Sequence, residues 1–155
     1  MTEDQKLKAR LRTDLNDAMR ARDEVRKSTI RMALSAITNE EVSGKAPREL
    51  SDDEILKVLT REAKKRREAA EAFEAAGRAQ QAAGERAEGE VLAEYLPRQL
   101  PDDELAQLVA AAIAAVGAVG MPALGQVMKT VTPQIAGRAD GSRVAAEVRR
   151  QLAST

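Results

Sequence analysis

Apolar residues recur at steps of three and four along most of the chain, which is the spacing of one face of an α-helix. The first stretch, in residues 7–19, has four large apolar positions: Leu7, Leu11, Leu15 and Met19. The pattern resumes over residues 25–42, with charged residues between the apolar positions. It predicts two amphipathic helices, followed by a loop at residues 43–47, where Gly44 and Pro47 disfavour a continuing helix.

A third helix is predicted to start at residue 51. Ser51 and Glu54 have the spacing of a capping box, in which the serine hydroxyl accepts from the Glu54 amide and the carboxylate reaches back. A long apolar stripe follows as far as Phe73. Glycines then interrupt a segment rich in Ala, Gln and Glu, at Gly77, Gly84 and Gly89. We therefore expect a turn near Gly77 and a weakly anchored helix that leads to Leu96.

Two prolines four residues apart, Pro97 and Pro101, mark the clearest boundary in the chain, because they exclude one continuous helix. Beyond them the pattern predicts three shorter helices, over about residues 102–116, 121–131 and 142–152. Pro133 is expected to stop the second of these. We thus expect an all-α protein, with a bundle of about four helices in residues 1–96 and a three-helix subdomain in residues 97–155.

Composition narrows the function classes. The chain has 25 Lys and Arg against 25 Asp and Glu, so no net charge draws it to nucleic acid or to an anionic membrane. It has no Cys and no His, which removes the commonest nucleophiles, general bases and metal ligands. The acids at residues 52–54 and 102–104 stand at predicted helix starts, where capping and the helix dipole account for them. We expect no catalytic residue, no metal and no cofactor.

No apolar stretch has the length of a membrane span, and the first residues mix both charge signs without the apolar core of a signal peptide. The sequence therefore predicts a cytoplasmic protein with no membrane partner. The pattern does not fix an oligomeric state, and we favour a monomer.

Two groups of basic residues are candidates for binding phosphate. The densest run lies in the predicted third helix: Lys64, Lys65, Arg66 and Arg67. The other group belongs to the last third of the chain: Lys129, Arg138, Arg143, Arg149 and Arg150. For the first group the alternative is a solvated helix face. For the second, the alternative is that Arg138 pairs with Asp140 or a helix end, in a loop that only folds the three-helix unit.

Three motifs carry a resemblance to a known family: residues 94–100 (EYLPRQL), 124–129 (LGQVMK) and 137–141 (GRADG). With them the chain resembles the bacterial YqeY proteins, whose C-terminal half is similar to the tail domain of GatB, the B subunit of the tRNA-dependent amidotransferase. The motif positions with a structural role are Pro97, Gly125, Gly137, Asp140 and Gly141. The two glycines of the last motif bracket a predicted turn that tolerates positive φ angles, and Asp140 is placed to cap the final helix.

The resemblance implies an N-terminal bundle joined to a GatB-like tail, and a non-catalytic module that binds tRNA or a tRNA aminoacylation or amidation enzyme. Two alternatives remain: an adaptor that binds protein without RNA, and an accessory subunit of a glutamine-dependent tRNA amidotransferase, a carbon–nitrogen ligase. Pro101 departs from the family pattern, which usually has Ser or Thr there as a helix cap. Residues 97–155 carry 6 − 5 = +1 charge, which predicts modest, salt-dependent RNA affinity.

Overall fold

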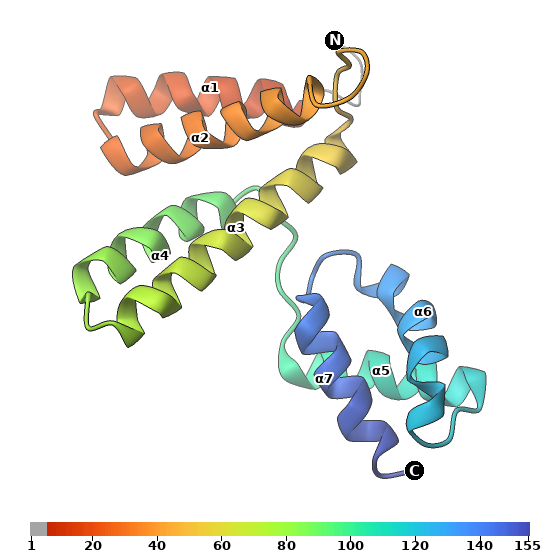
Figure 1. The fold of residues 1–155 in the computed structure, drawn as a ribbon. Coiled ribbons are helices and arrows are strands. Elements are labelled where there is room, and N and C mark those ends of the chain that lie inside the picture. Colours follow the sequence, from red (N-terminus) through yellow and green to blue (C-terminus); the bar gives the residue numbers. More distant parts are fainter. Residues whose placement is uncertain (1–5) are drawn as a thin grey trace. The chain divides into compact units, whose positions relative to one another are not determined.

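The computed structural model describes residues 6–155, and in that part of the chain every regular element is a helix (Figure 1). The all-helical class expected from the sequence is therefore confirmed. The chain divides into two compact units, unit 1 (Met1–Leu96) and unit 2 (Pro97–Thr155). Unit 1 contains α1 (Lys6–Ala21), α2 (Glu24–Glu41), α3 (Asp52–Ala75) and α4 (Ala79–Ala93). Unit 2 contains α5 (Asp102–Val116), the short 3₁₀ helix η2 (Met121–Ala123), α6 (Leu124–Ile135) and α7 (Gly141–Leu152).

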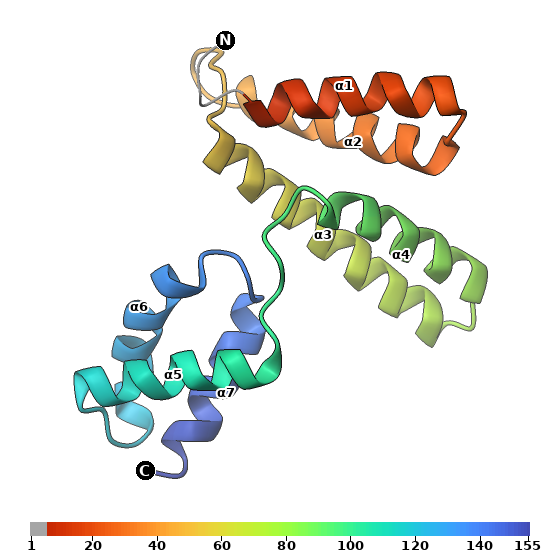
Figure 2. The ribbon, with the colours of Figure 1, turned by 180° about the vertical axis from the view of Figure 1, so that it is seen from behind.

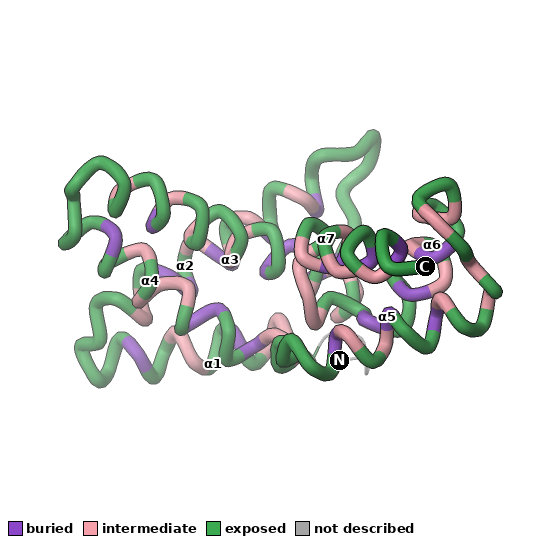
Figure 3. Tube along the Cα trace, turned by 90° about the horizontal axis from the view of Figure 1, so that it is seen from below, coloured by how far each residue is buried: buried purple, intermediate pink, exposed green. Residues whose placement is uncertain are grey.

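Unit 1 is built from two helical hairpins, α1–α2 and α3–α4 (Figures 1 and 2). Its core is mainly aliphatic and takes residues from all four helices and the loop before α3, including Leu11, Ile30, Leu50, Leu59 and Leu92. The predicted capping box is confirmed, since Ser51 Oγ accepts from the Glu54 amide and the Glu54 carboxylate accepts from the Ser51 amide. Burial alternates with exposure along each helix, as amphipathic packing requires (Figure 3).

The turn predicted near Gly77 is present, and Gly77 adopts a positive φ of 75° between α3 and α4. The expectation that the following helix is weakly anchored is wrong. Small residues let α4 lie against α3: Ala82 is 1% exposed, and a Cβ added to Gly89 would lie 3.9 Å from the Arg66 Cβ. This segment has no large apolar stripe because alanine and glycine make the contact between the helices.

Unit 2 encloses a separate aliphatic core, to which α5, α6 and α7 each contribute, including Leu105, Val109, Val131 and Val148. The first helix matches its predicted bounds, and the left-handed Gly117 (φ 63°) ends it. Pro101 is its N-cap residue and offers no side-chain cap.

Two details of unit 2 differ from the sequence prediction. Pro133 lies inside α6, which continues to Ile135, because so late in the helix the proline removes only the amide that would bond the Lys129 carbonyl. Ile135 is 3% exposed, so core burial stabilises this last turn. Asp140 occupies the N-cap position of α7, but its side chain makes no capping hydrogen bond.

Within the described residues, no single helix has the length and apolarity to cross a membrane. The segments Asp102–Val116 and Met121–Ile135 reach that composition only when taken together, and they are bent by 97° relative to each other.

Candidate nucleic-acid interface

The outward side of α3 carries the largest group of exposed cations that one helix presents in the described chain. The inner side of this helix buries Ile55, Leu59 and Ala70, so residues about half a turn away face solvent. Five exposed basic residues lie there or on its flanks, and we call them the α3 band: Lys57, Arg61, Lys64, Lys65 and Arg67. Only the last three belong to the basic run predicted from the sequence. The missed signal is the spacing of Lys57, Arg61 and Lys64 at i, i+4 and i+7.

Three basic residues of the α3 band form ion pairs in which the cation itself is exposed to solvent. Arg61 lies 3.3 Å from Glu40 of α2, Lys65 lies 3.3 Å from Glu62, and the Lys64–Glu68 distance is 4.0 Å. The three basic side chains are 60%, 67% and 48% exposed, respectively. Exposed single pairs contribute about 0–1 kcal/mol, so a phosphate can replace the carboxylate at little cost. The α3 band can therefore be a solvated helix face and still bind phosphate.

Arg66 differs from its neighbours in sequence because it points inward. Its side chain is 11% exposed and lies 3.0 Å from Glu88, 3.4 Å from Glu62 and 3.9 Å from Glu85. Nη2 also contacts the Met32 sulfur at 2.6 Å. Nε is buried, and its approach to Glu88 lacks hydrogen-bond geometry. Arg66 thus holds α2, α3 and α4 together, and it is not presented to an external ligand.

In unit 2, the guanidinium of Arg138 makes hydrogen bonds to the protein's own backbone. Nε donates to the Ile135 carbonyl at 3.1 Å and Nη2 to the Gln134 carbonyl at 2.9 Å, both at the C-terminal end of α6. The Arg138 carbonyl in turn accepts from the Leu100 amide at 2.7 Å. These contacts match the structural alternative, in which Arg138 pairs with a helix end. A phosphate-binding role for this residue stays a prediction.

The other basic residues of unit 2 divide into two sets. Arg143 bonds Asp102 at 2.6 Å, and Arg150 bonds Glu147 at 2.6 Å. The hydrogen bonds from Arg150 lower the pKa of Glu147, and Glu147 raises the pKa of Arg150. By contrast, Lys129 and Arg149, like Arg98 before α5, are exposed and form no ion pair with any described acidic residue.

A shallow cleft of about 560 Å³ lies between α5 and α7. Its charged lining consists of Asp102, Asp103 and Glu147 against Arg143 and Arg150. The acids outnumber the bases by 3 − 2 = 1, so the cleft has no cationic surplus to attract phosphate.

The first two residues of the EYLPRQL motif, Glu94 and Tyr95, make contacts within unit 1. The hydroxyl of Tyr95 donates to the Asp14 carboxylate, and the guanidinium of Arg10 lies 4.5 Å from the centre of the ring. Arg26 bonds Glu94 at 2.5 Å. Burial, followed by the hydrogen bond to Asp14, raises the pKa of Tyr95. The contacts join α1 and α2 to the end of unit 1.

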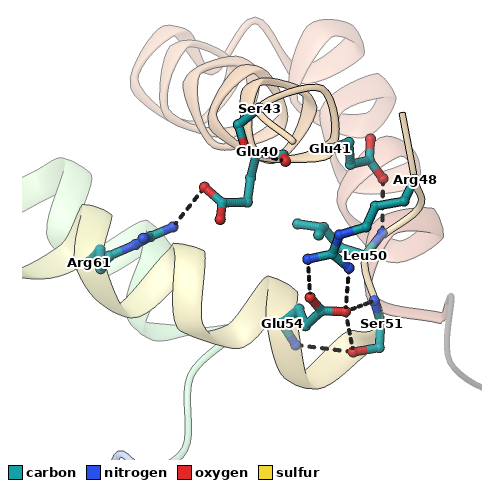
Figure 4. A network of polar contacts seen from close by, with 8 residues as sticks. All are labelled: Glu40, Glu41, Ser43, Arg48, Leu50, Ser51, Glu54 and Arg61. Carbon is teal, nitrogen blue, oxygen red and sulfur yellow. Dashed lines mark hydrogen bonds and ion pairs between the residues drawn. The ribbon is translucent and has the colours of Figure 1, made fainter. Parts of the chain in front are cut away.

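A second structural network surrounds the start of α3 (Figure 4). Arg48 bonds both carboxylate oxygens of Glu54, at 3.0 and 2.5 Å, and with Ser51 it lowers the pKa of Glu54 to about 2. Glu41 is 9% exposed and accepts from the Leu50 amide at 3.2 Å and from Lys8 at 2.8 Å. These carboxylates already have partners that the fold supplies, so nothing about them indicates catalysis.

These elements define an all-helical protein of two units, with no group of His, Cys, Asp and Glu suited to a metal ion among residues 6–155. The chain belongs to the YqeY family: the sequence model of that family, described as "Yqey-like protein", matches residues 8–152. The match spans both units and all three motifs. Among curated proteins, none matches the chain.

Proposed function

We propose that the protein is a non-catalytic module of tRNA metabolism, which binds the RNA backbone through the α3 band. The observation that carries this proposal is the outward row of Lys57, Arg61 and Lys64, with Lys65 and Arg67 on its flanks. Lysine and arginine side chains on a helix surface contact phosphate oxygens, and they position RNA without reading its sequence. Family membership and the resemblance of unit 2 to the GatB tail support tRNA as the RNA.

Unit 2 supplies a separate, weaker contact in this proposal. Lys129 of α6 and Arg149 of α7 are its exposed helical basic residues without an ion pair to a described acid, and Arg138 is engaged by α6. Two phosphate contacts give little affinity alone, and unit 2 contains no aromatic residue on which a base would stack. The larger share of the affinity is therefore assigned to α3.

Retention of bulk tRNA on filters over a salt series tests the proposal. The triple variant Lys57→Ala/Arg61→Ala/Lys64→Ala removes the row, and Lys129→Ala/Arg149→Ala removes the contact in unit 2. A matched control, Arg20→Ala/Lys45→Ala/Arg78→Ala, removes the same charge from exposed positions elsewhere in unit 1.

The row variant should lose most of the retention, and the slope of log K against log salt should fall in magnitude by about 2, since each phosphate contact contributes roughly 0.7. The control should keep both within experimental error. Equal losses in the two triple variants would mean that net charge alone is at work, and no retention at low salt would refute RNA binding.

The absence of catalysis is a separate part of the proposal. The purified chain should not convert Glu-tRNA to Gln-tRNA with glutamine and ATP, because without Cys it cannot form the thiolate that many glutaminases use, and it has no phosphate-binding loop motif. Product formation by the chain alone would overturn this expectation.

A further inference from the structure

The basic residues of the α3 band are arranged as a T on the surface of the helix. Lys57, Arg61 and Lys64 form a row along the axis, and the rise of 1.5 Å per residue places its two ends about 10.5 Å apart. Lys65 and Arg67 lie about 80° to either side of Lys57 around the helix. With Lys64 they form a crossbar at the C-terminal end of the row.

Carboxylates on the same side of α3 bound the row at both ends. Asp53 is exposed and lies four residues before Lys57. Glu68, whose side chain is 62% exposed, lies four residues after Lys64. A polyanion that ran along the helix axis would meet one of these acids beyond a row of only about two helical turns. A ligand that uses the whole band without meeting the acids must therefore cross the helix.

No aromatic side chain accompanies the cations of the band. The two aromatic residues of the chain are Phe73 and Tyr95, and Tyr95 is 5% exposed. Phe73 follows Lys57 by 16 residues, which places it about 160° away, on the side of the helix that buries Ile55. Proteins that bind single strands without sequence preference stack the bases on aromatic rings. The outward side of α3 offers no such ring.

Resting on the RNA binding proposed above, we propose that the α3 band binds double-stranded RNA, with α3 crossing its minor groove. The two strands that border this wide, shallow groove lie on the order of 10 Å apart, which matches the length of the row. The crossbar contacts neighbouring phosphates of one strand, and Lys57 contacts a phosphate of the other. Lys57 is exposed and forms no ion pair with any described acidic residue, so no carboxylate competes for it.

A single strand fits the band less well. It is flexible and must be ordered on binding, whereas a duplex presents both rows of phosphates in fixed positions. A single strand that follows the crossbar leaves Lys57 unused. One that follows the row approaches Asp53 or Glu68. The band therefore contacts more phosphates of a duplex than of a single strand.

Fluorescence anisotropy of two labelled RNAs, titrated with the full chain over a salt series, tests the proposal. One RNA is a blunt-ended duplex of about 16 base pairs, and the other is an unstructured single strand with the same number of phosphates. A pentalysine peptide, which has as many cations as the band, measures the duplex preference that charge density alone produces. The ratio of duplex to single-strand affinity should be at least about tenfold larger for the protein than for the peptide.

Lys57→Ala tests whether the helix crosses from one strand to the other. It should lower the magnitude of the salt slope for the duplex by about 0.9, the value of one phosphate contact, and leave single-strand binding unchanged. Lys45→Ala, at an exposed lysine in the loop before α3, is the matched control and should change neither. Circular dichroism establishes that each variant is folded.

Two results would overturn this inference and leave the proposed function standing, provided that the row variant still loses tRNA. The first is a duplex preference no larger than that of the peptide. The second is an equal loss of slope for duplex and single strand in Lys57→Ala, or no loss for the duplex. Absence of binding to either RNA at low salt would refute the proposed function and this inference with it.

Discussion

Unit 1 and unit 2 are both aliphatic helical folds, but they use charged residues in different ways. In unit 1, charged side chains lie at the junctions between helices: Lys8 with Glu41, Arg66 with its three glutamates, and Arg26 with Glu94. In unit 2, the Arg143–Asp102 and Arg150–Glu147 pairs each have one well-exposed partner, and residues 105–128 carry no charge at all. The position of a basic residue in the sequence therefore says little about whether it can bind a ligand, because the packing around the side chain determines its exposure.

The largest effect should come from a partly buried pair in unit 1. Lys8→Met leaves Glu41, whose side chain is 11% exposed, without its ammonium partner. Loss of one partner of a buried pair costs several kcal/mol, and here we expect about 2 kcal/mol because both side chains retain some contact with water. Urea unfolding followed by the fluorescence of Tyr95, the one tyrosine of the chain, measures it. A loss below about 0.5 kcal/mol would show that the Glu41 pair does not stabilise unit 1.

Low pH should weaken the ion pairs of Glu41 and Glu54 and so destabilise unit 1. Burial raises the pKa of Glu41, but the hydrogen bonds from Lys8 and the Leu50 amide lower it further, and Arg48 lowers that of Glu54 to about 2. Because these folded-state values lie below the unfolded value of about 4.3, their contribution to stability is present above that pH. It is lost as the pH falls from about 4.3 towards 2.

Urea midpoints measured over this pH range, again by Tyr95 fluorescence, test the assignment. Arg48→Ala should make the midpoint of unit 1 depend less steeply on pH. Its control is Arg20→Ala, at an 81% exposed side chain. An unchanged pH dependence in Arg48→Ala would contradict the role given to Glu54.

The same substitution should have opposite signs in the two units. Gly84 lies inside α4 with nothing within 4 Å of an added Cβ, so Gly84→Ala should stabilise unit 1 by about 0.5–1 kcal/mol. Gly117 ends α5 with a φ of 63°, so Gly117→Ala should destabilise unit 2 by about 1 kcal/mol. Thermal melts by circular dichroism measure both, and equal signs would contradict the backbone argument.

The smallest effect is expected for an exposed pair of unit 2. Arg143 bonds Asp102, whose side chain is 98% exposed, so Arg143→Met should change the free energy of unfolding by less than about 0.5 kcal/mol. Urea unfolding by circular dichroism measures this change. A loss of stability as large as that of Lys8→Met would contradict the difference claimed between the ion pairs of the two units.

The sequence predicted the helices well, because apolar periodicity and the Ser51–Glu54 spacing are local signals. It missed the continuation of α6 through Pro133, which depends on burial of Ile135 against the rest of unit 2. It also missed the packing of α4, where alanine and glycine give no amphipathic stripe.

The candidate site was predicted less well, because the exposure of each basic side chain also depends on packing between helices. Lys64 and Arg66 are two residues apart, and the sequence alone does not show that one faces solvent while the other is enclosed by glutamates from α3 and α4. For Arg138 the sequence left open both phosphate binding and pairing with a helix end, and its hydrogen bonds to the end of α6 depend on that helix continuing to Ile135.

The claim that RNA binds the outward side of α3 is tested most directly by NMR spectra of the labelled full chain with bulk tRNA at low salt. The account predicts that amide signals of residues 57–67 shift or broaden first and recover as salt is added. Perturbation confined to residues 137–150, or none at low salt, would contradict it.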